Sequence, residues 1–95
     1  MDANQYQDIV EKAFSAIETL LDESPVDLDY QNTGDGVIEI DFEDGGKIII
    51  SRHQAMQEIW VAASSGAFHF RWDGNHWRDT RSETELFAKI EQLLV

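Results

Sequence analysis

Carboxylates are the side chains of this sequence whose type and spacing could do chemistry. Between residues 8 and 29 they follow first a helical and then an alternating spacing, at Asp8, Glu11, Glu18, Asp22, Glu23, Asp27 and Asp29. Acids three or four residues apart on a helix repel one another by a few tenths of a kcal/mol per pair, so helix stability does not explain the pattern. Something other than folding must therefore explain the acids.

The same stretch lacks the ligands of a tight metal cage. No histidine falls within it, and the chain has no cysteine. A straight row of carboxylates suits hard cations, which prefer oxygen ligands, but cannot surround one ion, so water would complete the coordination and binding would be weak. Two other interpretations remain open at this point: a merely solvated helix face, and a docking surface for a basic protein.

The charge of the whole chain limits the classes of molecule that it can bind. The net charge is −12, and thirteen of the nineteen acids but only one of the seven bases fall within residues 1–44. Nucleic acids and anionic membranes bind proteins through Lys and Arg that replace their counterions, so a strongly acidic half argues against both. Cations and basic protein surfaces are the expected partners.

Length and composition predict one folded domain over residues 1–95. A chain of 95 residues can bury one modest core, and 42% hydrophobic residues argue against disorder. No apolar run approaches the roughly 20 residues that span a bilayer. The first residues, MDANQYQD, have neither the basic and apolar regions of a signal peptide nor the Arg-rich character of a transit peptide. We therefore expect a cytoplasmic protein.

The acids must be positioned by the elements that carry them, first by a helix. Apolar residues recur every three or four positions from residue 6, which predicts a helix over residues 3–23 with one apolar stripe. The stripe consists of Tyr6, Ile9, Val10, Ala13, Phe14, Ile17, Leu20 and Leu21. Asp2 or Asn4 is available to cap this helix, and Pro25 stops it.

After Pro25 the apolar period changes to two, which predicts strands. We expect them at residues 26–31, 37–42, 47–52, 57–63 and 67–72, with a short sixth at 76–78. Tight turns lie at 32–36, 43–46, 64–66 and 73–75, and residues 53–56 form a short connection. Because every connection is short, we predict an antiparallel meander.

A second helix is expected to begin at Ser82, with Glu85 completing a capping box. The pattern thus predicts the α+β class: a two-layer α-β sandwich with two roughly parallel helices on one face of a five- or six-stranded antiparallel sheet. The other face of the sheet would be bare and would carry Glu58, Trp60, His69 and Arg71. An aromatic ring beside cations is typical of interface hot spots, although a tryptophan can also simply cover strand backbone.

The ordered motifs of the sheet resemble the frataxin family, most closely its bacterial CyaY type. They are the Phe-x-Asp-Gly-x-Lys hairpin at residues 42–47, the Ile-Trp pair at 59–60 and the closing Gly-x-x-Trp at 74–77, after a first helix that ends in acids. The resemblance covers essentially the whole chain. It departs from the family at residues 51–55, which keep only the family's Arg, and at Glu58, where members commonly have Gln.

The resemblance implies an iron-binding protein of iron-sulfur cluster assembly. Its partners would be a cysteine desulfurase and the iron-sulfur scaffold protein, with the protein acting as iron donor, as regulator of the desulfurase, or as both. Iron, Fe2+ or Fe3+, would bind weakly, and other divalent cations would replace it. Carried over by position, the metal residues are Glu18, Asp22, Glu23, Asp27 and Asp29, with Glu11 as a further member; we call these six the acidic ridge. The exposed tryptophan that contacts partners corresponds to Trp60.

The remaining expectations concern catalysis, oligomeric state, an alternative function and the histidines. Enzymatic acid-base chemistry needs a pocket that separates two pKa values, which an exposed ridge does not provide, so we expect no enzyme and at most a weak carboxylate-dependent iron oxidation. We expect a monomer, with iron-driven oligomers left open. The alternative function is an acidic protein-interaction module that binds metal only incidentally. His53, His69 and His76 lie on different predicted elements, which argues against a histidine metal site.

Overall fold

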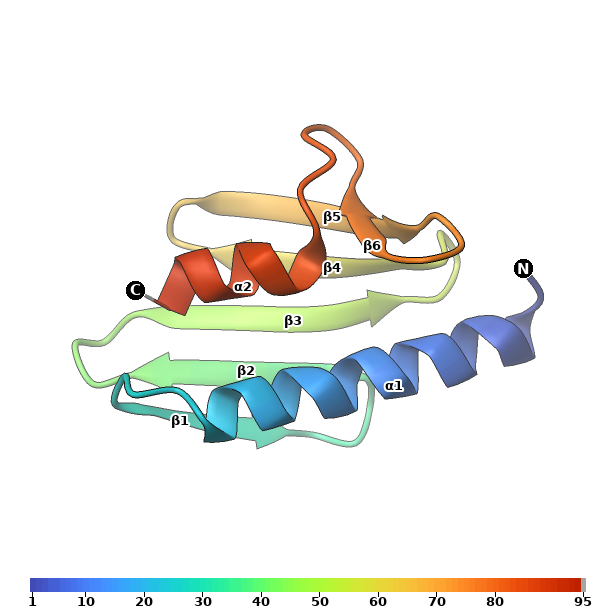
Figure 1. Cartoon of the computed structure of the whole chain (residues 1–95). Helices are drawn as coiled ribbons and strands as arrows, with labels where there is room; N and C mark the ends of the chain where they lie inside the picture. Colours follow the sequence, from blue (N-terminus) through green and yellow to red (C-terminus); the bar gives the residue numbers. More distant parts are fainter. Residues whose placement is uncertain (95) are drawn as a thin grey trace.

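An antiparallel sheet carries both helices on one of its faces in the computed structural model, which describes residues 1–94 (Figure 1). The elements in chain order are α1 (Ala3–Asp22), β1 (Leu28–Asn32), β2 (Val37–Phe42), β3 (Lys47–His53), β4 (Glu58–Ala63), β5 (Gly66–Trp72), β6 (Trp77–Asp79) and α2 (Leu86–Leu94). Each strand pairs with the next, in the order β1-β2-β3-β4-β5-β6. The predicted meander and the predicted two-layer α-β sandwich are confirmed.

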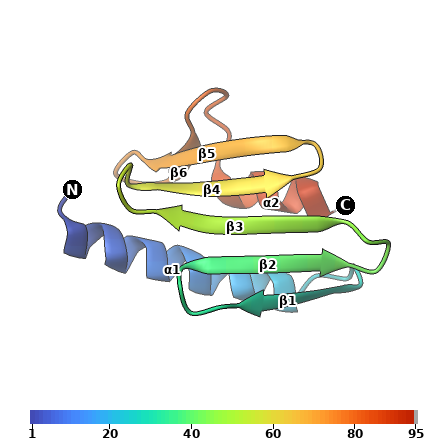
Figure 2. The ribbon, with the colours of Figure 1, turned by 180° about the vertical axis from the view of Figure 1, so that it is seen from behind.

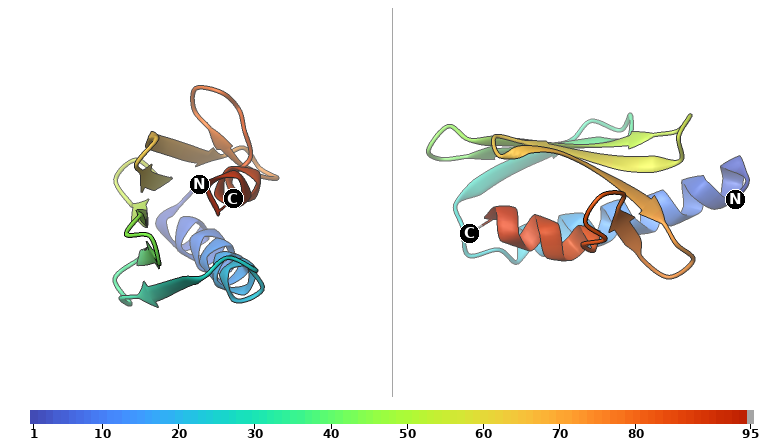
Figure 3. Two further views of the ribbon diagram at one scale, coloured as in Figure 1. Left: turned by 90° about the vertical axis from the view of Figure 1, so that its left-hand side faces the viewer. Right: turned by 90° about the horizontal axis from the view of Figure 1, so that it is seen from above.

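The two layers are plain when the molecule is turned. From behind, the sheet faces the viewer and both helices lie beyond it (Figure 2), and the end-on and top views separate sheet from helices (Figure 3). None of the helices within residues 1–94 combines the length and apolar character needed to cross a lipid bilayer.

α1 owes its start to a reciprocal cap. The carboxylate of Asp2 accepts the backbone N–H of Gln5 at 2.8 Å, and the Gln5 side chain accepts the N–H of Asp2 at 3.0 Å. The helix ends at Asp22, with Glu23 as C-cap, one residue before the predicted end. Its apolar stripe is buried at Tyr6, Val10, Ala13, Phe14, Ile17 and Leu21, as the period requires.

The core fills the space between the helices and the helix-facing side of the sheet. Every second residue of the central strands is fully or almost fully buried: Ile38, Ile40, Ile48, Ile50, Ile59, Val61 and Phe70. From α2 the buried side chains are Leu86, Ile90 and Leu94. The alternation leaves the opposite residues of each strand on the helix-free face, where their side chains are available to contact other molecules.

α2 does not begin as the sequence suggested. It starts at Leu86, and the predicted capping box of Ser82 and Glu85 is wrong. Glu83 has a φ of 62°, a left-handed conformation that keeps the preceding residues out of the helix. Glu85 caps the helix itself, because its Oε2 accepts the backbone N–H groups of Phe87 and Ala88 at 2.9 and 3.1 Å.

The strands differ from the predicted ranges at two places that matter for the candidate sites. β1 begins at Leu28 rather than at residue 26 and continues through Asn32, which was assigned to a turn. β3 continues to His53, which was assigned to the connection before β4. Both additions place a polar side chain on a strand, where register fixes its neighbours.

Candidate functional site

Two members of the acidic ridge are held by side chains of β1. Asp22 Oδ1 accepts the Tyr30 hydroxyl at 2.6 Å, and Glu18 Oε1 accepts the Asn32 side-chain N–H at 3.3 Å. Glu18 and Asp22 are four residues apart on α1 and therefore lie on the same side of the helix. The junction of α1 and β1 thus fixes two carboxylates beside each other at the protein surface.

The bond to Asp22 changes the acidity of Tyr30. The carboxylate of Asp22 accepts a hydrogen bond from the phenol, and this bond raises the pKa of Tyr30 to about 12. Desolvation and the charges of Asp22 and Glu18 add to the effect. The phenol is therefore a neutral donor at physiological pH. Within residues 1–94, the other oxygen of Asp22 accepts no hydrogen bond.

A second acidic group forms where β1 pairs with β2. Asp27 and Asp29 line a shallow hollow of about 300 Å³ together with Asp41 and Glu43. Asp29 lies directly opposite Asp41 in the antiparallel register, and Asp41 in turn contacts Lys47 Nζ at 3.6 Å. Asp41 and Glu43 are not among the six residues of the acidic ridge, although the strand register would have placed both beside Asp27 and Asp29.

The remaining ridge residues stand apart from these two groups. Glu11 is seven residues before Glu18, about 10 Å along the helix, and accepts the Gln7 side chain at 2.9 Å. Glu23 is exposed at the C-cap of α1. The structure therefore brings together Glu18 with Asp22, and Asp27 with Asp29, while Glu11 lies upstream.

No preformed metal cage is present in the part of the chain that is described. Among residues 1–94, no three side chains of His, Cys, Asp or Glu are arranged so that they could hold one ion. A cation at either acidic group would need water ligands or side-chain movement.

The helix-free face of the sheet carries a second candidate site around Trp60. The indole of Trp60 is stacked between two imidazoles: His53 at 4.0 Å and 9°, and His69 at 4.3 Å and 11°, measured between ring centroids and ring planes. All three residues are half-buried. We call these three side chains the His-Trp-His stack.

Glu58 lies on this face but is buried within it. It is only 4% exposed, although the sequence predicted it on the bare face with the partner-binding residues. Its two carboxylate oxygens accept Trp60 Nε1 at 2.8 Å and Arg71 Nη2 at 2.7 Å. Through these two bonds the Glu58 carboxylate holds the side chains of Trp60 and Arg71 in place.

His53 is the member of this face that sequence reasoning missed. It was placed in a connection, yet it ends β3 directly opposite Glu58, two residues from the pair of Ser51 and Trp60. Diagonal neighbours in an antiparallel pair are within reach of aromatic side chains. An antiparallel register extended by one residue would have revealed it.

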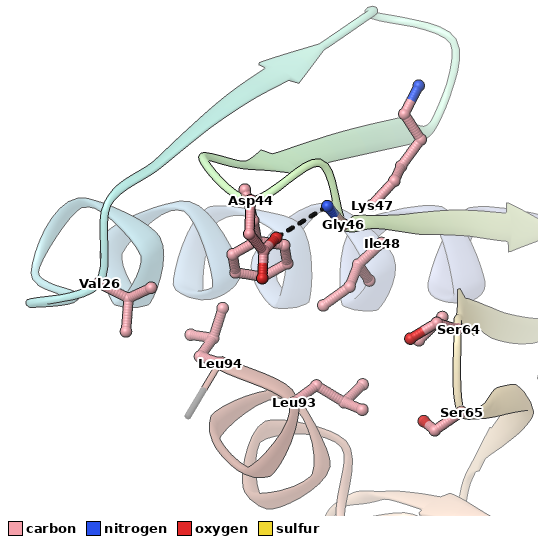
Figure 4. A pocket seen from close by; sticks show the side chains of 11 residues that line it. Val26, Asp44, Gly46, Lys47, Ile48, Ser64, Ser65, Leu93 and Leu94 are labelled. Atoms are coloured by element: carbon pink, nitrogen blue, oxygen red, sulfur yellow. Dashed lines mark hydrogen bonds between the residues drawn. The ribbon is translucent and has the colours of Figure 1, made fainter.

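Another hollow lies at the end of the sandwich. It has a volume of about 280 Å³ and lies between the β2-β3 turn and the end of α2 (Figure 4). Asp44 already accepts the N–H of Gly46 at 2.9 Å, and Lys47 extends away from the hollow. The charged groups at this hollow therefore serve the turn and the sheet.

Comparison with known proteins decides the family. The family model described as "Frataxin-like domain" matches residues 1–95. The chain belongs to the frataxin-like family. One curated relative, "Iron-sulfur cluster assembly protein CyaY" of Dechloromonas aromatica (strain RCB), is 46% identical over 93 residues, which cover 98% of this chain and 89% of the relative.

Further relatives agree in name and in fold. A protein of the same name from Paraburkholderia phymatum is 40% identical, over 97% of this chain and 87% of the relative. The solved frataxin from Psychromonas ingrahamii matches with a TM-score of 0.90 at 26% identity, over 98% of this chain and 88% of that one. Trimeric yeast frataxin, complexed with ferrous iron, matches with a TM-score of 0.62 at 20% identity, over 99% and 87% of the two chains, which shows the shared fold alone.

The frataxin-like hairpin has a clear physical basis in this chain. The backbone N–H of Phe42 donates to Gly46 O at 2.9 Å, and the N–H of Gly45 donates to Phe42 O at 3.0 Å. Gly45 has a φ of 95°, which glycine adopts without a steric penalty. The Phe-x-Asp-Gly-x-Lys motif thus specifies the turn that sets the register of β2 and β3.

Proposed function

We propose that this frataxin-like protein serves iron-sulfur cluster assembly by binding iron and a basic protein partner along its acidic ridge. The observation that carries the proposal is the fixed pair of carboxylates, Glu18 and Asp22, at the junction of α1 and β1. The names of the curated relatives and the ferrous complex of a protein with the same fold support it.

Iron is cargo in this proposal, held weakly by carboxylate oxygens and water. Each ion relieves part of the repulsion among acids that the fold keeps close together, which is the driving force for binding at an open site. Other divalent cations bind by the same chemistry. Oxidation of bound Fe2+ is at most a side property, since the curated relatives are named as assembly proteins.

The partners we propose are the cysteine desulfurase and the iron-sulfur scaffold protein. The acidic ridge attracts and orients a basic surface, so charge sets the association rate and salt weakens the complex. Trp60, Arg71 and His69 form a second contact area on the sheet face, with Glu58 beneath them. The working form in this proposal is a cytoplasmic monomer.

One observation favours a second candidate function, an acidic interaction module that binds metal only incidentally. Within residues 1–94, the ridge has no three ligands arranged around one point. A net charge of −12 concentrated in residues 1–44 is sufficient to attract a basic protein without any metal.

An anaerobic Fe2+ titration followed by backbone amide signals separates the two functions. Iron binding at the ridge shifts or broadens amides between Glu11 and Asp29, and E18Q/D22N reduces these changes. The matched control D35N/E83Q removes two exposed acids elsewhere and keeps the response. Unchanged signals over residues 11–29 in the native protein would rule out the iron-binding function.

Docking is tested with the purified desulfurase. Replacing Asp22, Glu23 and Asp27 by Ala is expected to weaken binding, and raising the salt concentration is expected to weaken the native complex more than that of the triple variant. Equal affinity of the two proteins at low salt would eliminate the ridge as a docking surface.

A further inference from the structure

The His-Trp-His stack leaves little of the Trp60 indole free. His53 covers one ring face at 4.0 Å and His69 covers the other at 4.3 Å, both nearly parallel to it. The indole N–H is bonded to Glu58 at 2.8 Å. A partner that packs against a face of Trp60 must therefore first displace an imidazole.

The two imidazoles are not equivalent. His53 Nδ1 is buried and has no hydrogen-bond partner among the described residues, so a proton there would be buried and unpaired. Neither ring nitrogen of His69 is in that position. The desolvation cost of an unpaired buried nitrogen therefore applies to a charge on His53 and not to one on His69.

The charged groups near His69 do not exclude a positive charge on its imidazole. On β4, Trp60 lies directly opposite and Glu58 lies two residues before it; on β5, Arg71 lies two residues after His69. Arg71 is paired with Glu58 at 2.7 Å, which offsets its repulsion of a charged imidazole. Arg78 on β6 lies opposite Arg71 but contacts Asp73 at 2.9 Å.

The charges around His53 come from three segments. Glu58 is opposite it on β4. The Gln57 side chain bonds to Met1 O at 2.7 Å, which brings the N-terminal amino group to this end of the sheet. Asp35 lies in the turn whose Gly36 O accepts the N–H of Arg52, while the Arg52 side chain is turned to Gln7 on α1.

We infer that the His-Trp-His stack is a proton-operated clamp on Trp60, closed when His69 is charged and open to partner docking when His69 is neutral. A charged imidazole over an indole adds a cation–π attraction that the neutral ring lacks. Imidazole is the side chain that changes charge between about pH 5 and 8. The inference rests on the proposed function, because it regulates the sheet face assigned there to the partner.

The size of the effect follows from that attraction. A cation–π contact at a partly exposed site corresponds to roughly a two- to fivefold change in equilibrium. Partner docking through Trp60 is therefore expected to weaken about two- to fivefold as the pH falls from 8 to 6. The response should belong to His69 and not to His53.

The first test uses the free protein. The indole N–H signal of Trp60, assigned with W60F, should shift with the same midpoint as the ring signals of His69. H69Q should abolish the shift, whereas H53Q and the control H76Q should retain it. An unshifted indole signal in the native protein, or an unchanged shift in H69Q, would overturn the clamp; retained amide signals of the sheet show that each variant is folded.

The second test measures binding to the desulfurase at pH 8 and pH 6. The ratio of the affinity at pH 8 to the affinity at pH 6 should be two- to fivefold larger for the native protein than for H69Q. The comparison with H69Q corrects for groups of the partner that titrate. H69R keeps a permanent planar cation over the indole and should bind weakly at both pH values. Equal ratios for native protein and H69Q would refute gating, whereas no binding by any variant would refute the proposed function and leave the clamp to be decided by the indole titration.

Discussion

Tyr30 donates a 2.6 Å hydrogen bond to Asp22, and this bond joins the first strand to the last turn of α1. It links a neutral phenol to a carboxylate of the acidic ridge. The bond orients one oxygen of the carboxylate and leaves the other accessible. The same contact gives the ridge a measurable signature in the ionisation of the phenol.

Replacing Asp22 by Asn should lower the pKa of Tyr30 from about 12 towards 10, because an amide oxygen does not repel the phenolate. The folded pKa is above the unfolded one, so the bond contributes stability that is complete below pH 10 and is lost as the pH rises from about 10 to 12. Ring-carbon NMR signals of Tyr30 measure the midpoint. The control is E23Q, which removes a negative charge one residue away. It should leave the titration midpoint of Tyr30 unchanged.

Asp73 should titrate far below an ordinary aspartate. Its carboxylate accepts the backbone N–H groups of His76 and Asn75 and the side chain of Arg78, and these bonds lower its pKa to about 2. The folded pKa is depressed, so this stabilisation is present above about pH 4 and is lost as the pH falls towards 2. Carboxyl carbon NMR shifts test this; a midpoint near 4 would contradict the turn geometry.

Truncation of Glu58 should destabilise the protein more than neutralisation does. E58A removes the acceptor of Trp60 Nε1 and should lower the free energy of unfolding by about 1–3 kcal/mol. E58Q keeps an oxygen for Trp60 and leaves Arg71, whose side chain is 59% exposed, free to be solvated, so it should cost less than about 1 kcal/mol. Urea unfolding compares the two variants; equal losses would mean that the charge, not the hydrogen bond, matters.

Alanine at Gly36 should be far more destabilising than alanine at Gly34. Both have positive φ, 80° and 85°, so both substitutions incur about 1–2 kcal/mol of backbone strain. A Cβ at Gly36 would also lie 2.5 Å from Arg52 Nε, whereas nothing lies within 4 Å at Gly34. Thermal unfolding of G34A and G36A isolates this clash; similar melting temperatures would show that Arg52 moves aside without cost.

The spacing of the hydrophobic residues was enough to predict most of the fold from the sequence. The stripe that includes Tyr6 and Ile17 and the alternation of Ile38 with Ile40 mark faces that must be buried, and short turns leave a meander as the economical topology. Helix starts are weaker signals. Ser82 and Glu85 satisfy the spacing of a capping box, but the positive φ of Glu83 breaks the turn between them.

The candidate site was predictable in residue type and less so in contact. The ridge acids follow from spacing and family resemblance, whereas the bond from Asn32 to Glu18 depends on where β1 ends. Glu58 was assigned to the correct face but not to the correct depth, because its burial depends on Arg71 and Trp60 from neighbouring positions. Such pairings belong to register, which period alone does not set.

The strictly sequential strand order has a consequence for how the chain reaches this structure. Hairpins joined by short turns close small loops, so they can form early. Each new strand can then pair with the edge strand formed just before it. α1 must instead find partners far along the chain; its Tyr6 hydroxyl bonds to Glu58 O, 52 residues away. The element that concentrates the negative charge is thus the one whose docking closes the longest loop, so salts that screen its acids should speed folding more than they slow unfolding.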